Sequence, residues 1–126
     1  MNVEEDGIHI LHALETVVLR QYKKNPALTD YEVLRAYETT IMFYTAQQKN
    51  QDPKLVALSP LEQTLYDSIS ITCQECVHGK GIFRSEPVGV DVIIACLKRL
   101  RKSVNMWTKN YGRQGYLNYI RNFIPG

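Results

Sequence analysis

One stretch, residues 88–109, constrains the fold more than any other part of this 126-residue chain. Its apolar side chains recur at alternating steps of three and four residues, a spacing that places them on one side of an α-helix. They are Val90, Ile93, Leu97, Leu100, Val104 and Trp107, with Ile94 and Cys96 widening the stripe. A stripe this regular has to be buried against other helices. The sequence therefore predicts a helix at the centre of a helical core.

Proline and capping residues mark where the other expected helices begin and end. Pro26 ends the first helix, because proline has no amide hydrogen and restricts the residue before it. Thr29 with Glu32, and Ser59 with Glu62, match the capping box, in which a hydroxyl and a carboxylate satisfy each other's backbone N–H groups. The expected helices cover residues 3–24, 30–49, 60–78, 88–109 and, as a short last element, 114–124.

The rest of the pattern favours the all-α class. No segment alternates apolar and polar residues convincingly at period two, and no internal repeat is visible. The polar run 47–53 and the glycine-containing segment 78–87 are typical of loops. We expect one domain, residues 1–126, folded as a compact helical bundle of four main helices plus a short C-terminal fifth helix.

The composition indicates the cellular compartment in which we expect the protein. No apolar run approaches the roughly 20 residues needed to cross a bilayer. The chain begins MNVEEDG, which is acidic, whereas a secretory signal begins basic and continues apolar. Three cysteines, an odd number, are more typical of a reducing compartment than of a disulfide framework. These features favour a cytoplasmic protein that does not act at a membrane.

Charge is divided unevenly along the chain. Residues 1–77 hold six Lys and Arg against eleven Asp and Glu, a net −5. Residues 78–126 hold nine against two, a net +7, so the overall +2 conceals the asymmetry. Two interpretations follow. The halves attract each other, within one molecule or between subunits, or the second half binds an anionic partner.

The basic character is concentrated on the side of the 88–109 helix that lies opposite its apolar stripe, and it continues into the last helix. The candidate anion-binding residues are Lys98, Arg99, Arg101, Lys102, Lys109, Arg113 and Arg121. Tyrosines alternate with the last three of them, a combination that can hold phosphates and stack bases. The alternatives are a solvated face, a contact with the acidic half of another subunit, and a site for nucleic acid or an acidic protein.

Cys73 and Cys76 form the other conspicuous group. A C-x-x-C pair is half of a zinc site, to be completed by Cys96 or by His9 and His12, or it is a redox pair. The pair falls at the C-terminal end of its expected helix, where the helix dipole raises a thiol pKa. It also continues an apolar stripe, which favours cysteines buried in the core.

No nucleophile elbow, metalloprotease motif or phosphate loop is present, so the sequence does not favour an enzyme and predicts no cofactor. Every expected helix carries an apolar stripe, and a chain of this length has limited interior in which to bury them all. We therefore expect a non-catalytic interaction protein that self-associates, most simply as a dimer. Binding of nucleic acid or another polyanion is the alternative, and a metal or thiol protein using Cys73 and Cys76 is a third.

Overall fold

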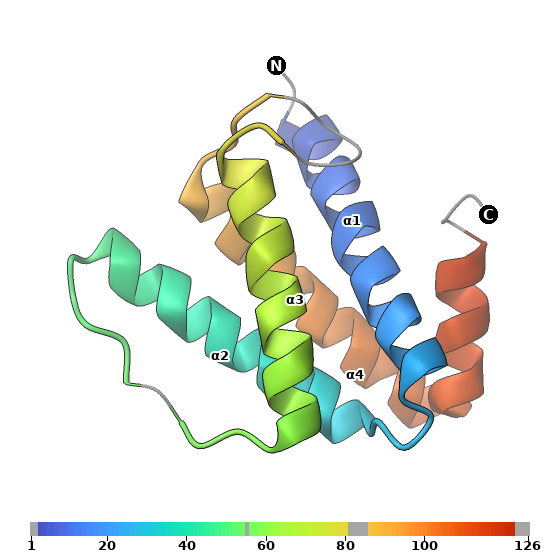
Figure 1. Ribbon diagram of the computed structural model, residues 1–126. Helices are drawn as coiled ribbons and strands as arrows, with labels where there is room; N and C mark the ends of the chain where they lie inside the picture. Colours follow the sequence, from blue (N-terminus) through green and yellow to red (C-terminus); the bar gives the residue numbers. More distant parts are fainter. Residues whose placement is uncertain (1–2, 55, 81–85, 123–126) are drawn as a thin grey trace.

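The computed structural model describes residues 3–54, 56–80 and 86–122, with side chains from residue 8 onward. These residues form four helices and no strand, which confirms the all-α class (Figure 1). The helices are α1 (Val3–Lys24), α2 (Asp30–Gln48), α3 (Pro60–Val77) and α4 (Val90–Arg121). Within the described ranges, none of these helices has the length and apolar content that a membrane span requires.

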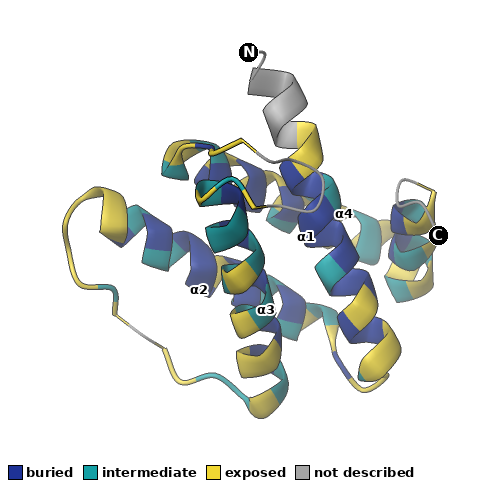
Figure 2. Cartoon of the chain, turned by 45° about the horizontal axis from the view of Figure 1, so that its top comes forward, coloured by how far each residue is buried: buried dark blue, intermediate teal, exposed yellow. Residues whose placement is uncertain are grey.

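The helices pack as a bundle in which α1 and α2 each contact both α3 and α4, whereas α3 and α4 touch over a short stretch only. Most of the stripe predicted for α4 is buried, including Ile93, Leu97 and Val104, whereas Val90 and Trp107 at its ends are half-buried. Lys98 and Lys102, on the opposite side of the helix, are exposed. The predicted orientation of this helix is therefore confirmed, and buried residues line the inward sides of the helices in Figure 2.

Both predicted capping boxes are present. The Oγ1 of Thr29 accepts from the amide of Glu32 at 3.2 Å, and the Thr29 amide donates to Glu32 Oε1 at 3.0 Å. Ser59 and Glu62 make the same two bonds, at 3.2 and 3.1 Å. The Ser59 hydroxyl also donates to Glu32 Oε2 at 3.0 Å, so the two boxes are joined. This bond fixes the first turns of α2 and α3 side by side.

An ion pair reinforces that junction. Arg35 Nε lies 3.0 Å from Glu62 Oε2, and Arg35 Nη2 donates to the carbonyl oxygen of Ala57 at 3.0 Å. Although partial burial raises it, the hydrogen bonds from Thr29 and Ser59 bring the pKa of Glu32 below its usual value. The carboxylate therefore stays charged at the N-termini of two helices, where the helix dipoles favour a negative group.

α4 is broken at Gly112, whose backbone has φ 74° and ψ 177°. This conformation is essentially restricted to glycine. After the break the chain turns back, so that the ring of Tyr119 stacks on Trp107 with centroids 4.6 Å apart. In a straight helix those two residues would be separated by about 18 Å along the axis. Residues 113–121 therefore return beside the preceding part of α4, and Figure 1 shows this segment (red) next to the second half of α1.

The short fifth helix predicted for residues 114–124 is not shown as a separate element: residues 113–121 are helical beyond the break but belong to α4, and residues 123–126 lie outside the described part. The helix boundaries also differ slightly from the prediction. α2 ends at Gln48, one residue before its predicted end, so Gln47 and Gln48 of the predicted loop 47–53 are helical, which fits the good helix propensity of glutamine. α3 ends at Val77, also one residue early. α4 begins two residues later than expected, with Gly89 as its N-cap. Residues 81–85 of the predicted 78–87 loop lie outside the described residues.

Candidate interaction surfaces

Three of the predicted anion-binding residues lie in a line on the outer side of α4. Lys98, Lys102 and Lys109 are all exposed. Their spacing of four and seven residues places them on one face of the helix, over about 16 Å along its axis. Within the part of the chain that the structure describes, none of the three forms an ion pair. We call these residues the lysine line.

The other predicted basic residues are placed differently. Arg101 Nη1 lies 3.8 Å from Glu38 Oε1 of α2. Arg113 donates from Nη1 to the carbonyl oxygen of Pro26 at 2.8 Å, and its guanidinium lies 4.2 Å from the centre of the Tyr22 ring. Arg99 is exposed on α4, and Arg121 is exposed near the end of the returning segment. The seven residues therefore do not form one free patch, because Arg101 and Arg113 already hold elements of the fold together.

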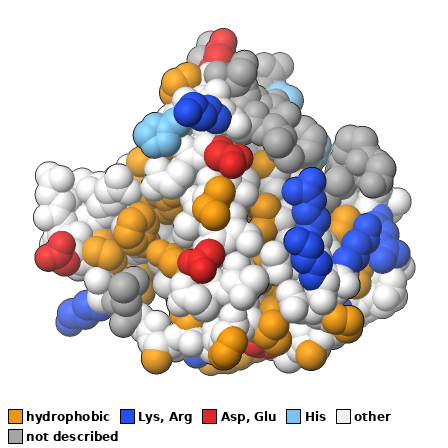
Figure 3. All heavy atoms as spheres, in the orientation of Figure 1, with side chains coloured by type: hydrophobic (Ala, Val, Ile, Leu, Met, Phe, Trp, Pro, Cys, Tyr) orange, Lys and Arg blue, Asp and Glu red, His pale blue; other side chains and the backbone are white. Residues whose placement is uncertain are grey.

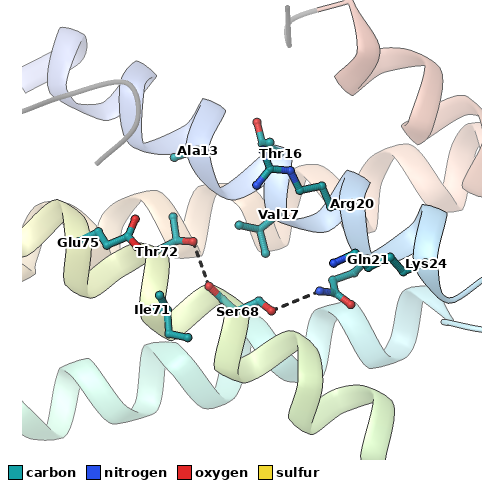
Figure 4. A pocket seen from close by; sticks show the side chains of 10 residues that line it. All are labelled: Ala13, Thr16, Val17, Arg20, Gln21, Lys24, Ser68, Ile71, Thr72 and Glu75. Carbon is teal, nitrogen blue, oxygen red and sulfur yellow. Dashed lines mark hydrogen bonds between the residues drawn. The ribbon is translucent and has the colours of Figure 1, made fainter. Parts of the chain in front are cut away.

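A second surface lies between α1 and α3, where a groove of about 350 Å³ runs along the bundle (Figure 4). The α1 side combines small and basic side chains, and the α3 side carries hydroxyls, one acidic group and an isoleucine. The lining residues are Ala13, Thr16, Val17, Arg20, Gln21, Lys24, Ser68, Ile71, Thr72 and Glu75. Ile71 also lines a shallower hollow on the other side of α3, so it forms a ridge between two depressions.

Exposure and charge distinguish this α1–α3 face. Ile71 is 60% exposed, although it is a large apolar side chain. Arg20 and Lys24 lie on the α1 side of the groove, and Glu75 lies on the α3 side. Asp67, one turn before Ile71 on the same helix, is exposed as well. In Figure 3, Lys and Arg side chains gather over α1 and the end of α4, and acidic side chains lie over α3. The face therefore carries both signs of charge, separated by the groove.

A third group of polar side chains is buried inside the bundle. Glu15, on α1, is only 6% exposed, and its Oε2 has no hydrogen-bond partner among the described residues. Burial raises the pKa of Glu15 to about 7, and the nearby Arg99 guanidinium opposes this shift. The hydroxyls of Tyr37 and Tyr116 are buried close to Glu15 and to each other without a well-aligned hydrogen bond. Burial, followed by the charge of neighbouring groups, raises their pKa values.

The cysteines lie in the core. Cys73 and Cys76 occupy the last turns of α3, as the sequence predicts, and both are buried with Cys96. Burial raises the pKa of the Cys73 thiol, and it raises that of Cys96 to about 11 despite the nearby Arg99. Thiols with raised pKa values are poor nucleophiles at neutral pH. In the described ranges, no three His, Cys, Asp or Glu side chains are grouped so as to hold a metal ion.

Two of these features escaped the sequence prediction, although each leaves a signal. Glu15 follows Leu11 by four residues and precedes Val18 by three, so it lies inside the apolar stripe of its helix. Ile71 falls on the opposite side of its helix from the stripe that runs through Leu65 and Ile69. A carboxylate on the buried face and an isoleucine on the exposed face are each exceptions to the helical pattern, and such exceptions indicate special positions.

Taken together, the fold and these surfaces define an all-α bundle with a grooved face of mixed charge and a separate line of exposed lysines. No protein-family model, curated protein or solved structure matches the chain.

Proposed function

We propose that this is a cytoplasmic, non-catalytic interaction protein that self-associates as a dimer. The observation that supports this most is Ile71, which is 60% exposed beside a groove on the α1–α3 face. A large apolar side chain leaves water favourably when a partner covers it. Because the same face carries both basic and acidic groups, it is able to complement a second copy of itself.

The test of this function is the molar mass of the purified protein. Light scattering after gel filtration at micromolar concentration is expected to give a mass above that of the 14.5 kDa chain. A mass that matches the single chain at every concentration would remove self-association and with it this function.

The lysine line supports a second candidate function, the binding of nucleic acid or another polyanion such as an acidic protein segment. Lys98, Lys102 and Lys109 are exposed and unpaired among the described residues, so their ammonium groups are available to phosphates. Contacts of this kind neutralise charge without reading bases, since no base-reading motif accompanies them. Binding would therefore be weak, independent of sequence and strongly dependent on salt.

Changing Lys98 and Lys102 together to Ala is expected to flatten the slope of log affinity against log salt by about two units, one per phosphate contact. A fluorescence titration with single- and double-stranded oligonucleotides between low and near-physiological salt measures this slope. The control is the loss of Lys49 and Lys54, two exposed lysines on the loop after α2, which is expected to change the slope less. Equal slopes for the two double variants would contradict a site on the lysine line.

A further inference from the structure

We infer that the second copy docks through the α1–α3 face in one defined arrangement, in which α3 of each copy lies against α1 of the other. This inference rests on the proposed self-association and adds its location and register. It follows from the level of each side chain along the two helices, from the position of Ile71, and from the signs of the charges.

The register of α1 and α3 is fixed by one contact. Gln21 Nε2 donates to Ser68 Oγ at 3.3 Å, so these two residues are level with each other (Figure 4). The helices run in opposite directions (Figure 1), and each residue advances about 1.5 Å along its axis. Four residues before Gln21 on α1 and four residues after Ser68 on α3, Val17 therefore lies level with Thr72. In the opposite direction, Lys24 lies close to the level of Thr64 and Leu65.

The same count places the groups that matter for docking. Asp67 lies between the levels of Arg20 and Lys24, and Ile71 lies at about the level of Val17. A two-fold axis parallel to the helices leaves every residue at the same level along the bundle. It places α1 of one copy opposite α3 of the other. The partner's Asp67 then approaches Arg20 and Lys24, and the partner's Ile71 approaches Val17. By symmetry each of these contacts occurs twice.

The alternative two-fold axis, perpendicular to the helices, places α3 on α3 of the second copy. Asp67 and Glu75 lie four residues before and four residues after Ile71 on the same helix face. If Ile71 packed on the partner's Ile71, Asp67 would meet the partner's Glu75. Like charges brought together in an interface oppose binding. The charges therefore select the arrangement in which α3 lies on α1.

Shape agrees with this choice. The α1 side of the groove presents Ala13, Thr16 and Val17, which are short side chains that leave room beside them. Ile71 projects from the other helix and is the large apolar side chain of this face. An isoleucine that enters the partner's groove would be removed from water while the oppositely charged groups remain at the rim, which is the usual division between the core and the edge of an interface.

The first test removes the apolar contact. Ile71→Asp is expected to raise the dimer dissociation constant by about tenfold or more, since a buried charge replaces a central apolar contact. The matched control is Met106→Asp, which changes a 52% exposed apolar residue on α4 and is expected to leave the dimer intact. If the wild type is a dimer and Ile71→Asp dimerises as tightly, the proposed interface is wrong, whereas self-association itself stands. A monomeric wild type overturns both.

The second test exchanges charges across the interface and shows whether α3 of one copy lies against α1 of the other. Asp67→Lys alone brings lysine against Arg20 and Lys24 of the other copy, and Arg20→Asp with Lys24→Asp brings acids against Asp67. Each of these proteins is expected to be monomeric at a concentration where the wild type is dimeric. Mixed in equal amounts they are expected to form a heterodimer, because both contacts then join opposite charges. With circular dichroism confirming that both are folded, a mixture that stays monomeric would overturn the arrangement.

Discussion

At the scale of single residues, Glu15 is the most unusual position in the bundle. Its carboxyl group is buried, and burial raises its pKa to about 7. In the unfolded chain the pKa of this group returns to its ordinary value of about 4.5. The folded state therefore binds more protons than the unfolded state between these two pH values. Stability that Glu15 contributes at low pH is lost as the pH rises through the folded pKa.

Glu15→Gln removes this titration. Relative to the variant, the free energy of unfolding of the wild type is expected to fall by up to about 3 kcal/mol between pH 4.5 and pH 8, from about 1.4 kcal/mol per unit of pKa shift. Urea denaturation of both proteins across this range measures the difference. Asp52→Asn, which changes an exposed carboxylate in a loop, serves as the control and keeps the wild-type pH dependence. If the free energies of unfolding of the wild type and of Glu15→Gln differ by the same amount at every pH, the pKa of Glu15 is not raised in the folded protein.

Leu97 and Lys98 test the orientation of α4 directly. Leu97 is fully buried, so Leu97→Ala is expected to cost about 2–5 kcal/mol through lost transfer energy and the remaining cavity. Lys98 is exposed on the neighbouring position, and Lys98→Ala is expected to change stability by less than about 0.5 kcal/mol. Chemical denaturation of both variants gives the two values. Similar losses of stability in the two variants would mean that the orientation described for α4 is wrong.

At the scale of helices and turns, the break in α4 allows the last described residues to pack against the preceding part of the same helix. Gly112→Ala is expected to destabilise the protein by about 1–3 kcal/mol, because the required backbone conformation is strained for any residue with a Cβ. Apart from the adjacent residues and the helix's own backbone, no atom of the described residues lies within 4 Å of the added Cβ, so the loss comes from the backbone conformation and not from a clash. The single tryptophan, Trp107, stacks on Tyr119 across the break and reports its state by fluorescence.

The control for this variant is Asn110→Ala, an exposed position just before the break, which is expected to change stability by less than about 0.5 kcal/mol. If Gly112→Ala unfolds like the control and leaves the fluorescence of Trp107 unchanged, the returning segment does not depend on the glycine.

The helices were predictable from the sequence because their signals are local. Thr29 and Ser59 act within three residues of themselves, and both capping boxes are confirmed. The bond from Ser59 to Glu32 was not predictable, since it depends on how α2 and α3 lie against each other. The same holds for the α1–α3 groove. The exposed side of Ile71 was visible in the helical pattern, but the groove beside it arises from the packing of two helices.

The break at Gly112 shows a similar limit. The sequence predicted that the long helix would end at residue 109, close to this glycine, but nothing local specified that Tyr119 would stack on Trp107. Predicted site residues divide in the same way. The lysine line follows from helical spacing alone, whereas the contacts of Arg101 with Glu38 and of Arg113 with Tyr22 depend on tertiary packing.

At the scale of the whole molecule, the structure shows where the charges of the acidic and basic halves of the chain lie. Arg101 of the basic half pairs with Glu38 of the acidic half, so part of the attraction operates within one molecule. The α1–α3 face draws all its charges, from Arg20 to Glu75, from the acidic half of the chain. The self-association and the anion binding that we propose therefore involve different surfaces, which makes them separately testable.

Sedimentation equilibrium of the wild-type protein over a series of micromolar concentrations shows whether the chain self-associates. Self-association through one two-fold interface predicts an average mass that rises with concentration toward twice 14.5 kDa and does not exceed it. A mass that remains at 14.5 kDa across the whole series would contradict the account.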